Sequence, residues 1–182
     1  LARIVDDVRD ALRFTYENAE RLGGDRQRLH VAGFSAGAHL AAMLLATKWA
    51  PRGLPADVIR SFTGVSGVYD LEPLRHLTLN ETLRIAAGDV LELSPLHRRP
   101  QSSAPLLLAV GGGESEEFRR QTRELSAAWS PYVSATTLVS EGRHHLGAQA
   151  ELADAGSPLA RAVLDRLGLR ASVQPGGAAP PS

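Results

Sequence analysis

Apolar side chains recur at steps of three and four along the first part of the chain. Their positions, with one threonine among them, are Ile4, Val8, Ala11, Leu12, Thr15, Ala19 and Leu22. This spacing places them on one face of an α-helix, and the charged residues between them fall on the opposite face. Gly23-Gly24 follows, and a glycine with positive φ commonly ends a helix. We therefore predict an amphipathic helix over residues 4–22.

Four short apolar or β-branched runs follow, separated by segments with helical periodicity. The predicted strands are residues 29–32, 58–65, 105–110 and 133–139. The third of them is apolar throughout, as is typical of a strand that a parallel sheet buries on both faces. The predicted helices are residues 38–47, 80–93, 116–129 and 157–167. This alternation predicts an α/β fold with a doubly wound, mostly parallel sheet.

Composition narrows the classes of function. The 182 residues fit a single domain, and 43% of them are hydrophobic. The 20 Lys and Arg residues balance the 20 Asp and Glu residues, so the chain lacks the basic excess that nucleic-acid binding requires. The absence of cysteine excludes disulfides and a thiolate nucleophile. No apolar run reaches the roughly 20 residues of a membrane helix, and no signal peptide is visible.

We therefore expect a soluble, cytoplasmic domain that acts on a small-molecule substrate and binds neither nucleic acid nor membranes. The sequence leaves open whether copies of the chain form a homo-oligomer. A helix whose apolar stripe is complete at residue 4 needs a core to face at once, so we expect further sequence upstream. The Pro-, Gly- and Ala-rich residues 169–182 are expected to form a disordered tail.

Gly33-Phe34-Ser35-Ala36-Gly37 matches the G-x-S-x-G pattern of a nucleophile elbow. An apolar run precedes it and an apolar helix follows, which is the strand–turn–helix context that the pattern requires. The turn lifts Ser35 above the sheet at a helix N-terminus, where developing negative charge is stabilised. The glycines leave room where a Cβ would collide with neighbouring backbone. We predict Ser35 as the nucleophile and the backbone N–H of Ala36 as an oxyanion donor.

A serine nucleophile of this fold is followed along the chain by its acid and then by its histidine base. Such groups lie in loops at the carboxyl ends of strands. Glu114 is the first acid after the third predicted strand, whereas Glu116 and Glu117 fall in the next helical turn and complement the helix dipole. Asp70, at the end of the second predicted strand, is the alternative acid, or else a turn residue that bonds its own backbone.

Two histidines follow the fourth predicted strand. Either His144 or His145 could take the proton of Ser35 and return it to the leaving group. The remaining histidines occupy helix, strand or loop positions that do not indicate catalysis, and they are His30, His39, His76 and His97. No pair of them has the spacing of metal ligands, so we expect no metal and no other cofactor.

Several segments, in this order, resemble the kynurenine formamidase (arylformamidase) branch of the α/β-hydrolases. They are GFSAGAHLAAML, SGVYDLEPLRH, SPLH, PLLLAVGGGESEEFRRQTRELSAAW and HHLGAQAELADAGSPL. The SGVYDLEPL and ES-x-EF-x-RQ stretches are far more specific than G-x-S-x-G, and the resemblance runs over residues 1–168. That family hydrolyses N-formylkynurenine to kynurenine and formate, and its bacterial relatives include esterases and other amide hydrolases.

The resemblance implies a role for each member of a triad. Ser35 corresponds to the nucleophile, and Glu114 to an acid that is often the shorter Asp in the family. His145 corresponds to the base, because the family's NHF triplet aligns with His144-His145-Leu146. Leu146 thus replaces an aromatic residue.

Further implications concern the substrate pocket and the oxyanion hole. Phe34, Tyr69 and Leu146 are expected to border the substrate. The family's HGG motif, which supplies further oxyanion N–H groups, does not occur in the sequence, and each lost donor typically costs ~10² to 10³ in turnover. The resemblance therefore implies an α/β-hydrolase domain over residues 1–168 without the early strands and the HGG loop. The strand before Ser35 would then have an open edge.

These observations predict a serine hydrolase that cleaves a formamide of the N-formylkynurenine type, or a small carboxylic ester, through an acyl-enzyme. The alternative is a catalytically incompetent hydrolase-fold fragment or interaction module, which the open edge favours. A nucleotide-binding domain is disfavoured, because the glycine runs make neither G-x-G-x-x-G nor G-x-x-x-x-G-K-[ST].

Overall fold

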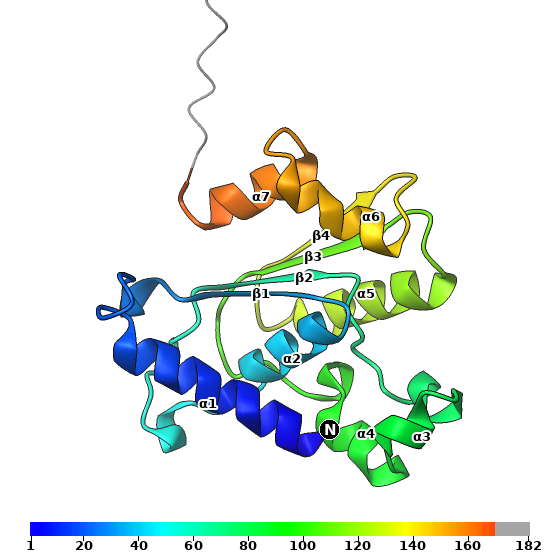
Figure 1. Cartoon of the computed structure of the whole chain (residues 1–182), viewed down its shortest axis with the longest axis horizontal. Coiled ribbons are helices and arrows are strands. Elements are labelled where there is room, and N and C mark those ends of the chain that lie inside the picture. The colour runs from blue at the N-terminus through cyan, green and yellow to red at the C-terminus, as the bar shows by residue number, and fades with distance from the viewer. Residues whose placement is uncertain (170–182) are drawn as a thin grey trace, which may run out of the picture.

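The computed structural model describes residues 1–169, and its centre is a four-stranded sheet between two layers of helices (Figure 1). The strands are β1 (His30–Phe34), β2 (Ser61–Val65), β3 (Leu106–Gly111) and β4 (Ala135–Ser140). They lie in the order β1-β2-β3-β4, and every neighbouring pair is parallel. All of the predicted strands are present with small shifts at their ends, and the predicted α/β class with a parallel sheet is confirmed.

The strand register brings the carboxyl ends of the strands to one edge of the sheet. Phe34 lies opposite Val65, Val65 lies opposite Ala109, and Ala109 lies opposite Leu138. The loops that leave the four strands therefore meet at this edge, which we call the carboxyl edge. In open α/β sheets this is where residues from different strands come together to form a site.

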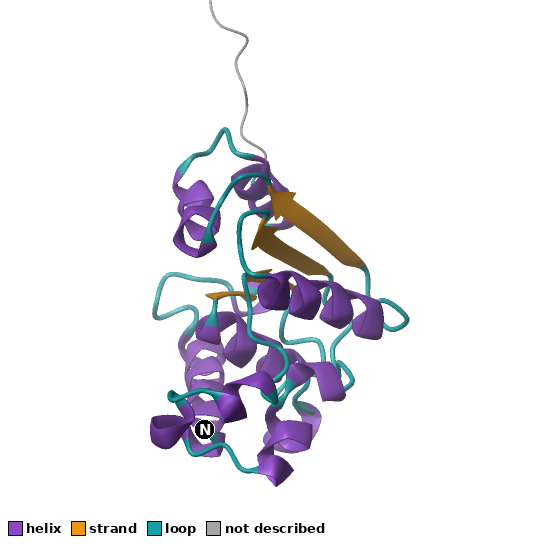
Figure 2. Cartoon of the chain, turned by 90° about the vertical axis from the view of Figure 1, so that its right-hand side faces the viewer, coloured by secondary structure: helices purple, strands orange, loops and turns teal. Residues whose placement is uncertain are grey.

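Helices cover both faces of the sheet (Figures 1 and 2). On one face lie α1 (Ala2–Asn18), α2 (Ala36–Leu45) and α5 (Glu116–Trp129), and on the other lie α6 (His145–Ala150) and α7 (Pro158–Arg166). Strand β3 contributes to both interfaces: Leu106 and Leu108 pack with the first group of helices, and Leu107 packs with the second. Every residue of β3 is buried, as its apolar run predicts.

The buried face of α1 differs from the predicted one, because Ile4, Ala11 and Thr15 of the predicted stripe are exposed. Val5 is fully buried, whereas Ile4 is 47% exposed. From Val8, a step of four leads back to Ile4 and a step of three leads back to Val5, so periodicity alone could not separate them. Packing in the core determines that Val5 is the buried residue, because it packs against Met43 of α2 and its neighbours. The helix also ends at Asn18, before the predicted end.

The predicted helix over residues 80–93 is split in two. Its parts are α3 (Asn80–Leu83) and α4 (Ala87–Leu93). Arg84 lies between them with a left-handed φ of 52°, and the Asn80 side chain accepts a hydrogen bond from the Ile85 N–H at 2.7 Å. This local bond offers the backbone an alternative to the helix, which is why the segment breaks.

A loop predicted around His144 and His145 is instead the beginning of a helix. His144 is the N-cap of α6, and His145 is its first residue. The tail expected over residues 169–182 lies, beyond Leu169, outside the described residues. Within residues 1–169 the helices are too short or too polar to cross a membrane, and no cluster of metal-ligating side chains occurs there.

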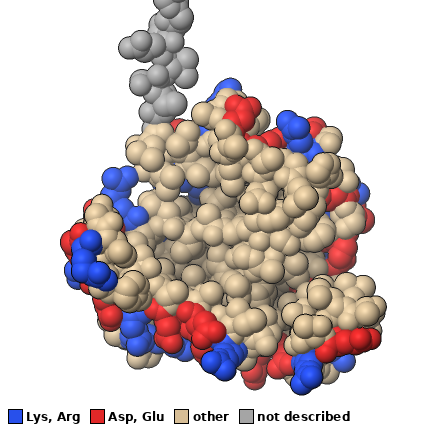
Figure 3. Space-filling model, in the orientation of Figure 1, with Lys and Arg blue, Asp and Glu red and all other residues tan. Residues whose placement is uncertain are grey.

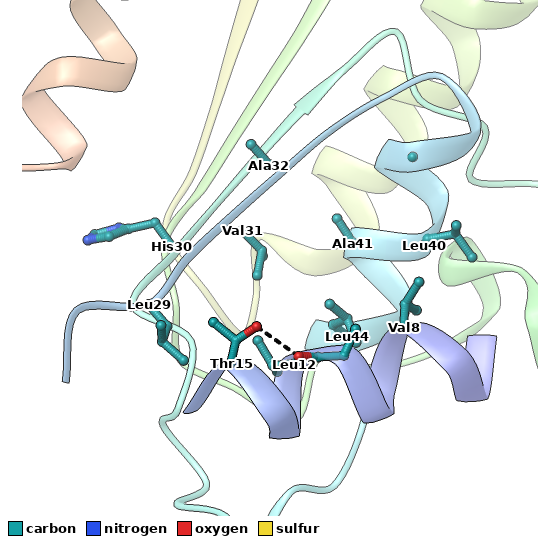
Figure 4. A pocket seen from close by; sticks show the side chains of 12 residues that line it. Val8, Leu12, Thr15, Leu29, His30, Val31, Ala32, Leu40, Ala41 and Leu44 are labelled. Carbon is teal, nitrogen blue, oxygen red and sulfur yellow. Dashed lines mark hydrogen bonds between the residues drawn. The ribbon is translucent and has the colours of Figure 1, made fainter. Parts of the chain in front are cut away.

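β1 is an edge strand of the described sheet, and a groove lies along its outer side. The groove has a volume of about 420 Å³ and runs between α1, β1 and α2 (Figure 4). Its lining is mainly apolar and includes Leu12, Val31 and Leu44. On this face the charged side chains lie mainly around the rim (Figure 3). The open edge expected before Ser35 is therefore present in residues 1–169.

Candidate active site

Ser35 occupies the sharp turn between β1 and α2. Its φ of 53° and ψ of −120° lie outside the regions that non-glycine residues favour. Its N–H donates to the Val65 carbonyl at 2.9 Å, and its carbonyl accepts from the Val68 N–H at 3.4 Å. A strained residue persists only where the surrounding structure holds it, and such strain is typical of nucleophile elbows.

The two glycines of the elbow have different surroundings. A Cβ on Gly33 would lie 2.2 Å from the carbonyl oxygen of Gly37, so no larger residue fits. A Cβ on Gly37 would meet nothing within 4 Å, because Gly37 faces the groove beside β1. The expectation that both glycines prevent a backbone collision is therefore right for Gly33 and wrong for Gly37 among the described residues.

Ala36 is the first residue of α2, and it is exposed. The first N–H groups of a helix have no acceptor within that helix. The Ala36 N–H is therefore available to a group bound above Ser35, at the end of the helix where the dipole favours negative charge.

Glu114 follows β3, and its side chain is only 1% exposed. Oε1 accepts hydrogen bonds from the Ser66 hydroxyl at 2.5 Å and from the Gly111 N–H at 2.7 Å. Oε2 lies 2.6 Å from Nδ1 of His145. Both oxygens of the buried carboxylate are therefore satisfied, which a charged group inside a protein requires.

His145 lies between two aromatic rings. The centroids of Phe34 and Phe118 are each 4.5 Å from that of the imidazole. A carboxylate only accepts, so Nδ1 carries the hydrogen when Glu114 is ionised, and Nε2 keeps a free lone pair. The side chain remains 32% exposed. The ring is thus held by Glu114 and two phenyl groups, with one nitrogen left to act as a base.

The contact between Phe34 and His145 brings the imidazole to the turn that carries Ser35, because Phe34 directly precedes Ser35 in the chain. Among residues 1–169 no hydrogen bond joins the Ser35 hydroxyl to His145. Catalytic hydrogen bonds are often long in the absence of substrate, so this geometry fits a nucleophile and base that approach each other when substrate binds.

The alternatives that the sequence left open lie away from this cluster. His144 is exposed and caps α6 through its own Nδ1. The Asp70 carboxylate accepts from the Arg120 guanidinium at 2.9 Å and has no contact with His145 in the described structure. Of the two candidate acids, the structure brings only Glu114 to a candidate base.

The residues expected to border the substrate differ in their positions. Phe34 is half-buried beside His145, and Leu146 is 65% exposed next to it. Tyr69 is fully buried in the core, which contradicts a role in substrate contact. The turn after β2 folds its ring against the backbone of Gly64 and Gly67, where a Cβ would collide with it. Burial also raises the pKa of the phenol, so it stays neutral.

Sequence reasoning missed three residues at the carboxyl edge. Ser66 contacts the carboxylate of Glu114, and Phe118 contacts the ring of His145. The side-chain oxygen of Gln121 accepts from the N–H groups of Tyr69 and Asp70, at 2.6 and 2.8 Å. All three lie in the two stretches of most specific resemblance, SGVYDLEPL and ES-x-EF-x-RQ. That was the available signal, although a resemblance does not say what each side chain touches.

Known proteins resemble this chain in sequence. A family profile named BD-FAE matches residues 2–66. The kynurenine formamidases of Salmo salar and Danio rerio are each 38% identical over 101 residues, which is 53% of this chain and 34% of either relative. The chain thus spans about a third of the length of these curated relatives.

Solved structures resemble it in fold. A proposed thioesterase from Silicibacter sp. TM1040 has a TM-score of 0.69 at 28% identity, over 87% of this chain and 56% of that one. An acetyl ester-xyloside bifunctional hydrolase from Caldicellulosiruptor lactoaceticus has a TM-score of 0.69 at 17% identity, over 92% of this chain and 66% of that one. The fold is therefore that of the α/β-hydrolases. Among proteins of this fold, the chain is similar in sequence to the two kynurenine formamidases.

Proposed function

We propose that the protein is a serine hydrolase that cleaves a formamide of the N-formylkynurenine type or a small carboxylic ester. The observation that carries the proposal is the 2.6 Å contact between Glu114 and His145, beside the strained turn that holds Ser35. Sequence similarity to kynurenine formamidases supports an amide or ester bond as the target.

In the proposed acylation step, Ser35 Oγ attacks the carbonyl carbon and His145 Nε2 takes the hydroxyl proton. Glu114 accepts from Nδ1–H and stabilises the resulting imidazolium. The carbonyl oxygen becomes negative as the tetrahedral intermediate forms, and the Ala36 N–H donates to it. His145 then gives its proton to the leaving amine or alcohol, and the acyl group remains on Ser35.

Deacylation repeats the same proton transfers with water. His145 takes a proton from the water that attacks the acyl carbon and returns it to Ser35 Oγ as the C–O bond breaks. The product is formate or another small carboxylate. Phe34 and Phe118 keep the imidazole in one orientation throughout, so Nε2 stays aligned with both oxygens.

Reaction with a fluorophosphonate tests the nucleophile directly, because it requires an activated serine but no natural substrate. We expect a single adduct on Ser35 by peptide mass spectrometry, and none in Ser35→Ala. Ser140→Ala is the control, since it removes a serine hydroxyl at the carboxyl end of a different strand, β4. An intact chain that stays unlabelled, or that is labelled at another serine, would contradict the proposal.

Steady-state assays then separate the two substrate classes. N-formylkynurenine and p-nitrophenyl acetate are compared at equal enzyme concentration, with Ser35→Ala as the blank for each. A higher kcat/KM on the formamide would identify the formamidase activity, and the reverse would identify an esterase. Loss of both activities in Ser35→Ala is expected in either case.

The open edge of β1 favours a second candidate function, that of an interaction module. Within residues 1–169, β1 is an unpaired edge strand beside an apolar groove, and it offers backbone groups and apolar surface to another chain. This candidate predicts association during size-exclusion chromatography together with no ester or formamide turnover. A labelled, active monomer would exclude it.

A further inference from the structure

We infer that Ser66 is a positioning residue that fixes the carboxylate of Glu114 for His145, and that the turn after β2 serves to hold Ser66 in place. The inference deepens the proposed function and relies on it for the role of His145 as base. It rests on the contacts of a single buried carboxylate and on the strained backbone beside it.

The carboxylate of Glu114 needs donors because it is buried without a cationic partner of its own. Within residues 1–169 no Lys or Arg side chain contacts it. Arg119 and Arg143 are engaged elsewhere: Arg119 donates to the Gly112 carbonyl at 2.6 Å, and Arg143 pairs with Glu151 at 3.1 Å. Hydrogen bonds from Ser66, Gly111 and His145 therefore supply what solvent would otherwise provide.

Ser66 determines how the carboxylate is rotated. With the Ser66 hydroxyl and the Gly111 N–H both on Oε1, the other oxygen is directed at Nδ1 of His145. The Gly111 N–H comes from the backbone that also carries Glu114, so it cannot by itself fix the side chain relative to the rest of the sheet. The Ser66 hydroxyl comes from the residue after β2, so it ties the carboxylate to a second part of the chain.

The conformation of Ser66 indicates that the surroundings hold it. It is completely buried, and its φ of 49° places a non-glycine residue in the left-handed region. Its N–H donates to the Ala109 carbonyl on β3 at 2.7 Å. Such strain persists only where neighbouring contacts over-determine the backbone.

Those contacts come from the turn that follows. Gln121 accepts from two consecutive N–H groups of the turn, and the hydroxyl of Ser94 accepts from the Leu71 N–H at 3.0 Å. The turn also reaches the nucleophile, because the Val68 N–H donates to the Ser35 carbonyl. A single segment, residues 65–71, thus joins the backbone of Ser35 to the acid. This gives a role to the SGVYDLEPL stretch, which the proposed reaction leaves unexplained.

The test uses Ser66→Ala and Ser66→Gly in the full chain, with Ser61→Ala as the control. Glycine adopts the left-handed φ at lower cost than alanine, so the pair separates loss of the hydroxyl from backbone strain. Ser61 lies at the other end of β2, and its hydroxyl bonds His30 at 2.7 Å instead of Glu114. Thermal unfolding is recorded first for each variant, so that folded samples are compared.

Two readouts report on the pair of Glu114 and His145. The first is the downfield proton resonance of His145 Nδ1–H, assigned by its absence in His145→Gln, and it requires no turnover. The second is the rate of fluorophosphonate labelling, supplemented by the split between kcat and KM. We expect both Ser66 variants to move or broaden the resonance and to slow labelling about tenfold, as is typical of losing one hydrogen bond to a charged group. kcat should fall while KM is kept, since Ser66 is buried.

An unchanged resonance in both Ser66 variants would overturn the inference, as would its absence in the wild type. An effect in Ser66→Ala alone would also overturn it, because strain and not the hydroxyl would then be responsible. An equal effect in Ser61→Ala, whose hydroxyl does not contact Glu114, would overturn it as well, because the effect would then not be specific to Ser66. If the resonance responds to Ser66 as expected but Ser35 is never labelled, the inference stands and the proposed function fails.

Discussion

The carboxyl edge of the sheet and the outer edge of β1 meet at Ser35, yet they are built in opposite ways. At the carboxyl edge the polar groups are paired within the chain, and Glu114 has a partner for each oxygen. Along β1, apolar side chains border a groove of about 420 Å³ that nothing in residues 1–169 fills. The acid and base of the candidate triad therefore depend on β2, β3 and β4, whereas only the nucleophile turn depends on the open side.

The acid at the carboxyl edge is expected to show the largest effect. Glu114→Gln should lower kcat by about 10⁴-fold, because an amide cannot hold the imidazole in the required tautomer or stabilise its protonated form. Asp70→Asn is the matched variant, since it neutralises the other candidate acid, which pairs with Arg120. It should change kcat only a few-fold. Steady-state kinetics with p-nitrophenyl acetate measure both, and a larger loss in Asp70→Asn would reverse the assignment.

Alanine substitutions at the two elbow glycines compare the packed side of the turn with the side that faces the β1 groove, because each adds one methyl group. Gly33→Ala places a Cβ 2.2 Å from a backbone oxygen, so the free energy of unfolding should fall by roughly 4 kcal/mol or more. Gly37→Ala meets no atom and lies within α2, where alanine is favoured by up to about 1 kcal/mol. Urea unfolding measures both changes, and a destabilised Gly37→Ala would show that the groove side is filled in solution.

Sequence patterns located the elements because their signals are local. The unbroken apolar run of β3 and the G-x-S-x-G turn depend on residues that are adjacent in the chain. Burial of Tyr69 and the contact between Ser66 and Glu114 depend on how two loops pack, and no periodicity encodes that. The same limit explains the wrong prediction that Ile4 lies on the buried face of α1, since only the position of the core shows that Val5 is buried instead.

A third prediction concerns acid stability on the packed face of α2. His39 is one turn past Ser35 and almost fully buried, and its Nε2 lies 2.7 Å from the Leu93 carbonyl of α4. Burial lowers the pKa of His39 in the folded protein, while the unfolded chain binds the proton at about pH 6.5. Stability is therefore complete above that pH and should fall by about 1 kcal/mol by pH 5.5.

His39→Gln tests this dependence, because the amide can still donate to the Leu93 carbonyl but does not titrate. Urea midpoints at pH 7.5 and 5.5 should converge in this variant and remain apart in the wild type. His30→Gln is the control: burial lowers the pKa of His30 too, but that side chain is only partly buried beside Ser61. Its substitution should remove less of the acid sensitivity. If His30→Gln removed more, the acid loss would belong to the start of β1.

The smallest expected effect belongs to the outer edge of β1. Unpaired edge strands invite pairing with another chain, and lysine opposes it. Ala32→Lys puts a charge at an exposed position of β1, so it should weaken self-association by up to about 1 kcal/mol, or roughly fivefold in Kd, if two edges pair. Val139→Lys places the same charge on the exposed side of β4, the other edge strand, and should have no such effect. Sedimentation at several concentrations measures Kd.

Equal effects of the two substitutions would remove the distinction between the edges of the sheet. A wild type that stays monomeric would show that the β1 groove needs no second copy of the chain. Labelling of Ser35 should be the same in all three proteins, because neither position touches Glu114 or His145.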